Sequence, residues 1–224
     1  MNEERTMETQ SLYLTGVSNA RTLAGYRTQD GRAIRPHKLL RTRMLVKATP
    51  QDMDILVNQE HLGMIIDLRT ETEVKAGKDP IMDGVSWYNI HVSDEQLDKG
   101  ANDAMTRMYE GDPINALIEM VRQGIMNEDT YIRFVQSEVS QKGFAQFFRQ
   151  LRALPEDKSV LWHCTGGKDR AGTAAVAIAG VIGAWMRRMI QYLKEEYGSV
   201  VHYIEEVLHA SKQDMETLQK MYLQ

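Results

Sequence analysis

Cysteine is almost absent from this sequence: Cys164 is the single cysteine among 224 residues. One thiol cannot form an internal disulfide, and it cannot build a zinc site that needs several cysteines. The six histidines show no metal-ligand spacing, so we expect no metal. Cys164 is therefore either a small buried apolar residue, as most free cysteines are, or a reactive group.

Long hydrophobic runs are missing as well. The longest, over residues 171–185, falls short of the roughly 20 residues that a helix needs to cross a bilayer, and we interpret it as a buried helix. The opening MNEERTMETQ is polar and lacks the apolar stretch of a secretory signal. We therefore expect a cytoplasmic protein, with export by a non-classical route left open.

A basic excess is also absent, because the formal net charge is -4. Domains that bind the phosphate backbone usually carry a strong positive excess, so we expect no nucleic-acid partner. The length and the 42% hydrophobic content suffice for one buried core. We predict a single domain over residues 1–224, of an oligomeric state that the sequence does not define.

Short apolar runs alternate with helical patterns along the chain. Runs rich in branched residues predict buried strands at 64–68, 85–92 and 159–162. Helical signals occur over 112–122, from 127–130 onward, and over 144–154, where five apolar residues form one stripe that Pro155 ends. Strands that alternate with helices predict an α/β fold with a mainly parallel central sheet flanked by helices.

The stretch HCTGGKDRAG, residues 163–172, follows the last of these strands and begins the next helix. Five residues separate Cys164 from Arg170, enough to curl the backbone into a nest of inward amides, and the glycines permit the positive φ that a nest requires. The helix N-terminus and the planar fork of Arg170 favour a tetrahedral dianion there. We expect the phosphate-binding residues to be Thr165, Gly166, Gly167, Lys168, Asp169 and Arg170.

The combination of Cys164 with the two glycines, Lys168, Asp169 and Arg170 favours a reactive cysteine over a buried structural one. We predict that the Cys164 thiolate attacks the phosphorus of a monoester and that water then hydrolyses the phosphocysteine, with no organic cofactor required. A carboxyl group must protonate the leaving oxygen. The candidates are Asp94, after the strand predicted over 85–92, and Asp169. Asp94 is alternatively a surface turn residue, and Asp169 a salt-bridge partner that fixes the loop.

The loop resembles that of bacterial tyrosine and phosphoinositide phosphatases of the His-Cys-x-x-Gly-Lys-Asp-Arg type, a branch of the protein tyrosine phosphatase superfamily. Residues 19–26, 66–70 and 196–199 resemble three other segments of that family. The resemblance implies a phosphatase-like fold with the phosphate-binding loop between a strand and a helix. It also matches Asp94 to the family's proposed acid. The family often carries a helical lid between the helix after the loop and the segment that corresponds to residues 196–199, whereas in this sequence residues 183–185 lead almost directly into residues 186–197.

Five further residues are expected to support the loop. Asn19, Arg21, Asp67 and Arg69 take this role from the resemblance alone. His163, which precedes the nucleophile, is interpreted as a hydrogen-bond partner that braces the loop rather than as a base.

The resemblance also implies substrates: phosphotyrosine in proteins, and phosphoinositides. A phosphatase specific for soluble inositol phosphates is a further alternative. Lys168 could meet a second phosphate or remain solvated. Residues 27–47 contain seven basic side chains and Asp30 as the only acid, a run that could steer anionic headgroups or phosphopeptides and allows transient contact with a membrane surface. For most of these side chains, a solvated face is the simpler interpretation.

A cysteine in a loop of this kind also occurs in two other functional classes. In a sulfurtransferase, a loop cysteine carries a persulfide, but the seven-position loop from Cys164 to Arg170 argues against it. A non-catalytic module that binds phospho-ligands would not need both residues.

Overall fold

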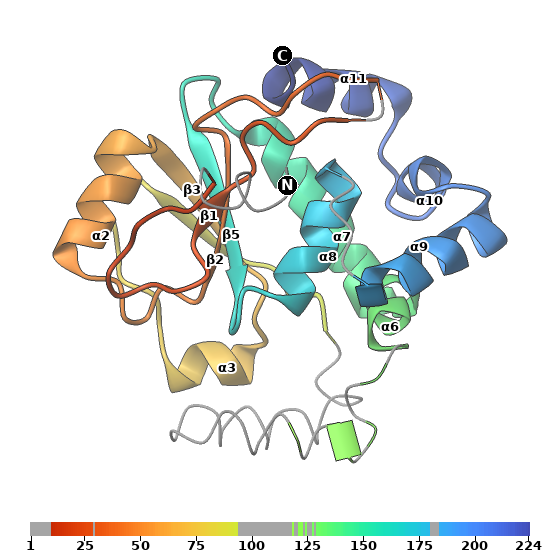
Figure 1. The fold of residues 1–224 in the computed structure, drawn as a ribbon, viewed down its shortest axis with the longest axis horizontal. Coiled ribbons are helices and arrows are strands. Elements are labelled where there is room, and N and C mark those ends of the chain that lie inside the picture. The colour runs from red at the N-terminus through yellow and green to blue at the C-terminus, as the bar shows by residue number, and fades with distance from the viewer. Residues whose placement is uncertain are drawn as a thin grey trace, which may run out of the picture.

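The computed structural model describes residues 10–28, 30–93, 118, 121–122, 124, 127, 129–179 and 184–224. At its centre lies a five-stranded sheet of order β1-β2-β5-β3-β4 (Figure 1). The strands are β1 (Arg21–Thr22), β2 (Leu39–Arg43), β3 (Leu62–Asp67), β4 (Ser86–Asn89) and β5 (Ser159–Cys164). Only β1 is antiparallel to its neighbour. The predicted α/β fold with a mainly parallel sheet is therefore confirmed.

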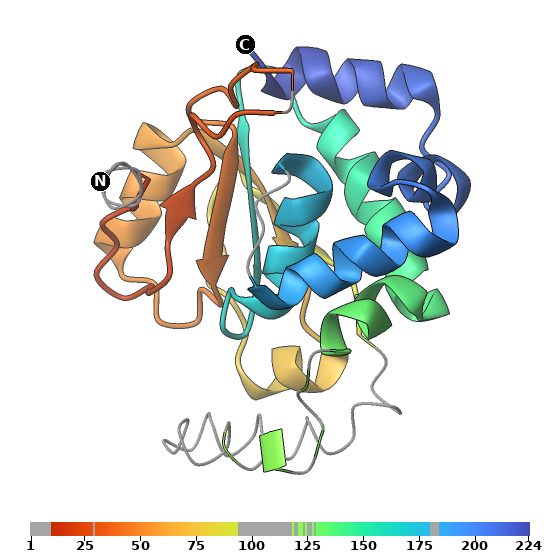
Figure 2. The ribbon, with the colours of Figure 1, turned by 45° about the vertical axis from the view of Figure 1, so that its right-hand side comes forward.

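Helices cover both faces of this sheet (Figures 1 and 2). Their bounds are α2 (Pro50–Asp54), the π-helical turn η1 (Ile55–Gln59), α3 (Glu71–Ala76), α6 (Thr130–Gln136), α7 (Glu138–Ala153), α8 (Asp169–Ala179), α9 (Ala184–Tyr197), α10 (Val200–Glu206) and α11 (Lys212–Tyr222). The larger core lies between the sheet and α6 to α11, and a smaller one lies beside α2 and η1. None of the helices described is long and apolar enough to cross a membrane.

Most predicted elements are present with small shifts in their bounds. The strands predicted at 64–68 and 159–162 are β3 and β5, and the one predicted over 85–92 is the shorter β4. The apolar stripe over 144–154 lies on α7, and the helix expected from 127–130 is α6. The helix expected over 112–122 lies mostly outside the described residues.

Strand β5 is the central strand, and it is buried along its whole length because helices cover both of its faces. Trp162 is fully buried and meets Phe147 of α7 edge to face, with ring centroids 5.7 Å apart. Its indole N–H donates to the Ala171 carbonyl at 3.0 Å. This bond ties the first turn of α8 back to β5, so the intervening loop is held at both of its ends.

Helix α3 begins beside the carboxyl ends of the parallel strands (Figure 1). Thr70 is its N-cap, and a capping box joins the Thr70 side chain and the Glu73 side chain to each other's backbone amides. The box fixes Glu73 in the first helical turn, where its carboxylate is buried.

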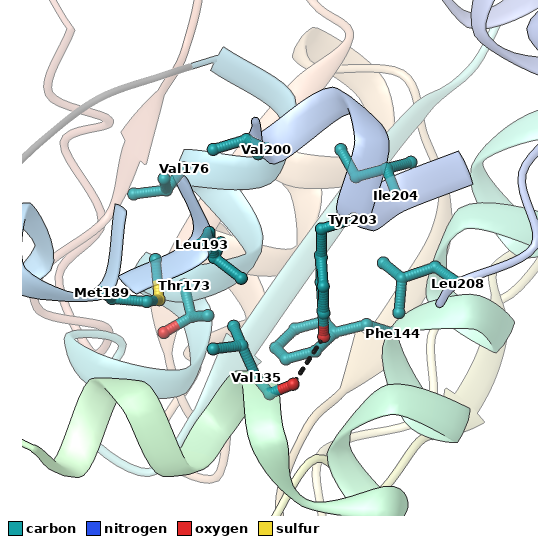
Figure 3. Close-up of a pocket in the computed structure, with 10 residues that line it drawn as sticks. All are labelled: Val135, Phe144, Thr173, Val176, Met189, Leu193, Val200, Tyr203, Ile204 and Leu208. Atoms are coloured by element: carbon teal, nitrogen blue, oxygen red, sulfur yellow. Dashed lines mark hydrogen bonds between the residues drawn. The ribbon is translucent and has the colours of Figure 1, made fainter. Parts of the chain in front are cut away.

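A small apolar cavity lies among the helices on the side of the larger core (Figure 3). It holds about 20 Å³, room for about one water molecule. Its lining residues are Val135, Phe144, Thr173, Val176, Met189, Leu193, Val200, Tyr203, Ile204 and Leu208. The Tyr203 hydroxyl already has a hydrogen-bond partner, because it donates to the Val135 carbonyl at 2.9 Å. We interpret this cavity as a packing gap rather than as a ligand site.

Candidate active site

The loop from Cys164 to Arg170 leaves the carboxyl end of β5 and enters α8. Four consecutive loop carbonyls accept hydrogen bonds from outside the loop. The donors are the Met44 amide to Thr165 at 3.3 Å, the Asn19 side-chain amide to Gly166 at 3.0 Å, and the Arg41 guanidinium to Gly167 at 3.0 Å and Lys168 at 2.7 Å. Because these carbonyls are held outward, the loop amides are left on its inner side, as an anion-binding nest requires.

The two loop glycines differ in what they contribute. Gly167 has a φ of +67°, and a Cβ there would lie 2.2 Å from the Thr42 carbonyl oxygen, so only glycine fits. Gly166 is not among the positive-φ residues, and a Cβ there meets nothing within 4 Å. Both glycines were expected to permit a positive φ, and Gly167 is the one that adopts it. Within the described part of the chain, neither glycine amide has a hydrogen-bond acceptor.

Arg170 is buried against a carboxylate that sequence reasoning missed. Its two terminal nitrogens donate to Glu73 at 2.6 and 2.7 Å, and the Thr165 hydroxyl donates to the same carboxylate. Burial by itself raises the pKa of Glu73, but the Arg170 charge and these hydrogen bonds outweigh it and lower the pKa to about 2. In turn, Glu73 raises the pKa of Arg170 against the opposing effect of burial. The guanidinium is thus fixed, charged and held beside the loop.

The segment after β4 reaches the same guanidinium. Ser93 is buried, and its hydroxyl lies 3.5 Å from an Arg170 terminal nitrogen, which also contacts the Leu68 carbonyl at 3.4 Å. Asp94, the first candidate for the acid, lies outside the described residues. The chain that leads to it therefore passes beside Arg170.

Asp169 begins α8 and is bonded to α6. Its carboxylate accepts a hydrogen bond from the Tyr131 hydroxyl, and Lys168 Nζ lies 4.0 Å from the same carboxylate oxygen. Burial and the nearby Asp169 charge raise the pKa of Tyr131, so this hydroxyl remains a donor at neutral pH. Arg170 takes Glu73 rather than Asp169 as its carboxylate partner.

The amino-terminal residues expected to support the loop lie against its outer side. Asn19, at a φ of 57°, donates to Gly166, and Arg21 donates to the Asn19 side-chain oxygen. Arg41 on β2 lies next to them and is 7% exposed, although the sequence placed it in a solvated basic run. Burial, reinforced by the Arg21 charge, lowers the pKa of Arg41 to about 10, so it stays cationic at neutral pH.

That basic run does not form one patch. Arg32 pairs with Asp30 at 2.6 Å and donates to the Gln219 side chain at 3.0 Å. Arg35 donates to the Leu223 carbonyl at 2.9 Å, so both arginines contact the carboxyl-terminal residues. Lys38 donates to the Glu156 carbonyl at the opposite end of β5. Among the described basic residues of this run, Arg41 is the one that bonds to the loop.

Beneath the loop lies a buried layer of charged groups. Asp67 and Arg69, both expected here, are bonded to each other at 2.8 to 3.1 Å. His163 Nε2 lies 2.7 Å from Asp79, and its Nδ1 lies 3.7 Å from Asp67. Asp79, which sequence reasoning missed, also accepts from Arg69 at 3.1 Å.

This layer contains the one group of metal-ligand type in the described ranges: Asp67, Asp79 and His163. Arg69 donates to both carboxylates. A guanidinium in that position opposes a bound cation, and we interpret the layer as an ion-pair network.

Comparison with known proteins agrees with this geometry. Residues 12–185 match the tyrosine phosphatase family. A protein of Cupriavidus necator, described as a putative tyrosine-protein phosphatase, is 26% identical over 167 residues, which are 75% of this chain and 56% of that protein. The chain thus spans about half the length of that relative. The family match covers most of the sequence and includes the whole loop, so the chain belongs to the tyrosine phosphatase family, a family of cysteine-dependent phosphomonoester hydrolases.

Proposed function

We propose that this chain hydrolyses phosphomonoesters through a phosphocysteine intermediate on Cys164. The observation that supports this most directly is the outward rotation of four consecutive loop carbonyls, from Thr165 to Lys168. A loop so arranged directs its amides toward the space that an oxyanion would fill, in front of the sulfur.

The proposed reaction has two in-line displacements. In the first, the sulfur of Cys164 forms a bond to phosphorus as the ester oxygen leaves with a proton from a carboxylic acid. In the second, water attacks phosphorus and gives one proton to the carboxylate left by the first step, while the sulfur–phosphorus bond breaks and its electron pair returns to the sulfur. Loop amides and Arg170 hold the three equatorial oxygens through both steps, and this electrostatic contribution is the largest one. Glu73 fixes the direction of the Arg170 fork.

Cys164→Ser tests the nucleophile, with p-nitrophenyl phosphate as substrate and tungstate as the phosphate analogue. We expect turnover to be lost and tungstate affinity, measured by calorimetry, to stay within about threefold of wild type, because the nest is unchanged. Turnover by Cys164→Ser would contradict the assignment. A parallel assay of cyanide with thiosulfate distinguishes sulfur transfer, and tungstate binding without turnover in the wild type would indicate a binding module.

The general acid in this proposal is Asp94, with Asp169 as the alternative. Ser93 contacts Arg170, and this contact supports Asp94, the next residue, as the acid. The hydrogen bond from the Tyr131 hydroxyl to Asp169 supports a structural role for Asp169. Phenyl phosphate has a poorer leaving group than p-nitrophenyl phosphate, so losing the acid should slow its hydrolysis more. Asp94→Asn should therefore widen the rate ratio between these substrates, whereas Asp169→Asn should lower both rates together. The reverse pattern would assign the acid to Asp169.

For the substrate, we propose phosphotyrosine in proteins, with phosphoinositides as the alternative that Lys168 favours. The side chain of Lys168 is 65% exposed beside the loop, within reach of a second phosphate. Initial rates on a phosphotyrosine peptide, a phosphoserine peptide and monophosphorylated inositol lipids decide between them. If Lys168→Met lowers only the rates on inositol lipids, the alternative is correct.

A further inference from the structure

Three arginines share one face of the sheet beside the nucleophile. Strands β1 and β2 form the side of the sheet that adjoins β5 (Figure 1). Arg21 of β1 is the register partner of Arg41, and Arg43 of β2 is the register partner of Cys164. Register partners and alternate residues of a strand point to the same face of a sheet. Arg21, Arg41 and Arg43 therefore lie on the face of Cys164.

The charges of these arginines are not neutralised by acids nearby in the sequence. Over residues 10–51, Asp30 is the only acid, and it pairs with Arg32. Among the described residues, none of the three arginines forms an ion pair with a carboxylate. Like charges directly opposite each other in an antiparallel pair are destabilising, and burial followed by the Arg21 charge lowers the pKa of Arg41 to about 10. An anion beside these arginines would relieve their repulsion.

Arg21 and Arg43 are the two of the three that a ligand can contact. Both are half-buried, whereas Arg41 is 7% exposed and donates to carbonyls of the loop. Arg21 donates to the Asn19 side-chain oxygen, and Arg43 Nη1 lies 3.5 Å from the Ser18 hydroxyl. A guanidinium has five N–H donors, so both side chains retain donors for an anion. Diagonal neighbours in an antiparallel pair lie about 7 to 8 Å apart, close enough for one carboxylate to meet both.

This pair of guanidiniums lies at the rim of the phosphate-binding loop. Asn19, which accepts from Arg21, donates to the carbonyl of Gly166, and Gly166 is exposed. A ligand group that meets the pair therefore lies about one side-chain length beyond the bound phosphate, as the residues that flank a phosphotyrosine do. A second phosphate on an adjacent carbon of an inositol ring lies nearer to the first one. The planar guanidinium fork matches a carboxylate with two parallel hydrogen bonds.

We propose that Arg21 and Arg43 form a subsite that binds the carboxylate of an acidic residue next to the phosphotyrosine of a peptide substrate. Arg41 adds its positive charge from beneath the loop without touching the ligand. The inference rests on the proposed function for the phosphotyrosine itself. Its physical content, a contribution to peptide binding, is measurable without any turnover.

Phosphotyrosine peptides of equal length test the subsite in the full chain. One carries aspartate on both sides of the phosphotyrosine, and the other carries asparagine. The wild type should hydrolyse the aspartate peptide with a kcat/KM about tenfold higher, the effect of one charge-assisted hydrogen bond. Arg43→Met should abolish this preference and leave the kinetics on p-nitrophenyl phosphate unchanged, because that substrate has no flanking residue. An equal loss on all three substrates would indicate a damaged loop and would overturn the proposal.

Two comparisons distinguish a subsite from long-range attraction. Arg149→Met removes the same charge from an exposed position of α7, and it should keep the preference for aspartate. Peptides with aspartate only before or only after the phosphotyrosine should differ, because the two arginines lie on one side of the loop. If both positions contribute equally and Arg149→Met weakens the preference as much as Arg43→Met does, the effect is general electrostatics and the subsite is refuted.

Calorimetry on Cys164→Ser measures peptide binding without turnover and needs no change at Arg43. The aspartate peptide should bind about tenfold more tightly than the asparagine peptide, and equal affinities would overturn the proposal. If this difference is present but the wild type hydrolyses no phosphomonoester, the proposed function alone is wrong. If the wild type is active without a preference, this inference alone is wrong. If Arg43→Met slows only the hydrolysis of bisphosphorylated inositol lipids, the pair binds a second phosphate and the peptide subsite is excluded.

Discussion

The carboxylate of Glu73 and the guanidinium of Arg170 form a two-point ion pair, with bonds of 2.6 and 2.7 Å, although 97 residues separate them in the chain. Both side chains are at most 8% exposed. In such a setting the pair is little screened by salt, and neither partner can be removed without leaving the other buried and uncompensated.

Glu73→Gln should therefore lower both stability and turnover. Glutamine at this position retains the capping box, so the change isolates the loss of charge. We expect a loss of about 3 kcal/mol in the free energy of unfolding and a lower kcat, because the Arg170 fork loses its orientation. Denaturant unfolding and p-nitrophenyl phosphate kinetics measure the two effects. Glu71→Gln, on the exposed side of the same helix beside Lys75, should change neither, and a similar loss there would contradict this explanation.

The same pair predicts how stability depends on pH. The pKa of Glu73 is lowered from 4.5 to about 2, a difference that contributes about 3 kcal/mol to stability. A lowered carboxyl pKa contributes fully above the ordinary value and is lost as pH falls through the folded value. The gap in stability between wild type and Glu73→Gln should thus be constant above about pH 5 and shrink between pH 4.5 and 2. Equilibrium unfolding across that range measures it, and a gap that persists at pH 2 would exclude Glu73 as the cause.

Gly167→Ala should damage the loop more than positive φ alone explains. A methyl group there combines the φ of +67° with a 2.2 Å approach to the Thr42 carbonyl, so β2 and the loop must separate. Gly84→Ala is the matched control, since Gly84 has a φ of +76° and open space around its Cβ position. We expect the control to cost about 1 to 2 kcal/mol. Gly167→Ala should cost more and should also weaken tungstate binding, and equal costs would show that the close approach is tolerated.

Arg41→Met should weaken oxyanion binding without removing any group from the nest itself. Its guanidinium holds the carbonyls of Gly167 and Lys168, and hydrogen bonds of this charged kind contribute about 1.5 to 3 kcal/mol. Loss of both hydrogen bonds should reduce tungstate affinity, measured by calorimetry, at least tenfold. Arg149→Met, at an exposed position of α7, controls for the lost positive charge. If both variants lose affinity equally, the role of Arg41 is general electrostatics rather than positioning.

The sequence predicted the parts of this site that are local. Cys164 and Arg170 lie on a strand, a glycine-containing loop and a helix that follow one another in the chain. The five-residue spacing between them therefore predicts the loop conformation directly. Glu73, Arg41 and Asp79 were missed because their roles depend on partners that are distant in the sequence. Glu73 had one local signal, the Thr70-x-x-Glu73 capping-box pattern, which indicates a helix start but no partner. Nothing local to Arg41 distinguishes a buried guanidinium from the solvated ones around it.

The outer bonds of the loop span long stretches of chain: Asn19 is 147 residues from Gly166, and Arg41 is 126 residues from Gly167. Contacts this distant form only after large chain loops have closed, which is slow and entropically costly. Affinity for an oxyanion should therefore arise late in refolding, once β5 has inserted between β2 and β3. Tungstate binding in stopped-flow refolding thus reports on completion of the sheet rather than on early collapse.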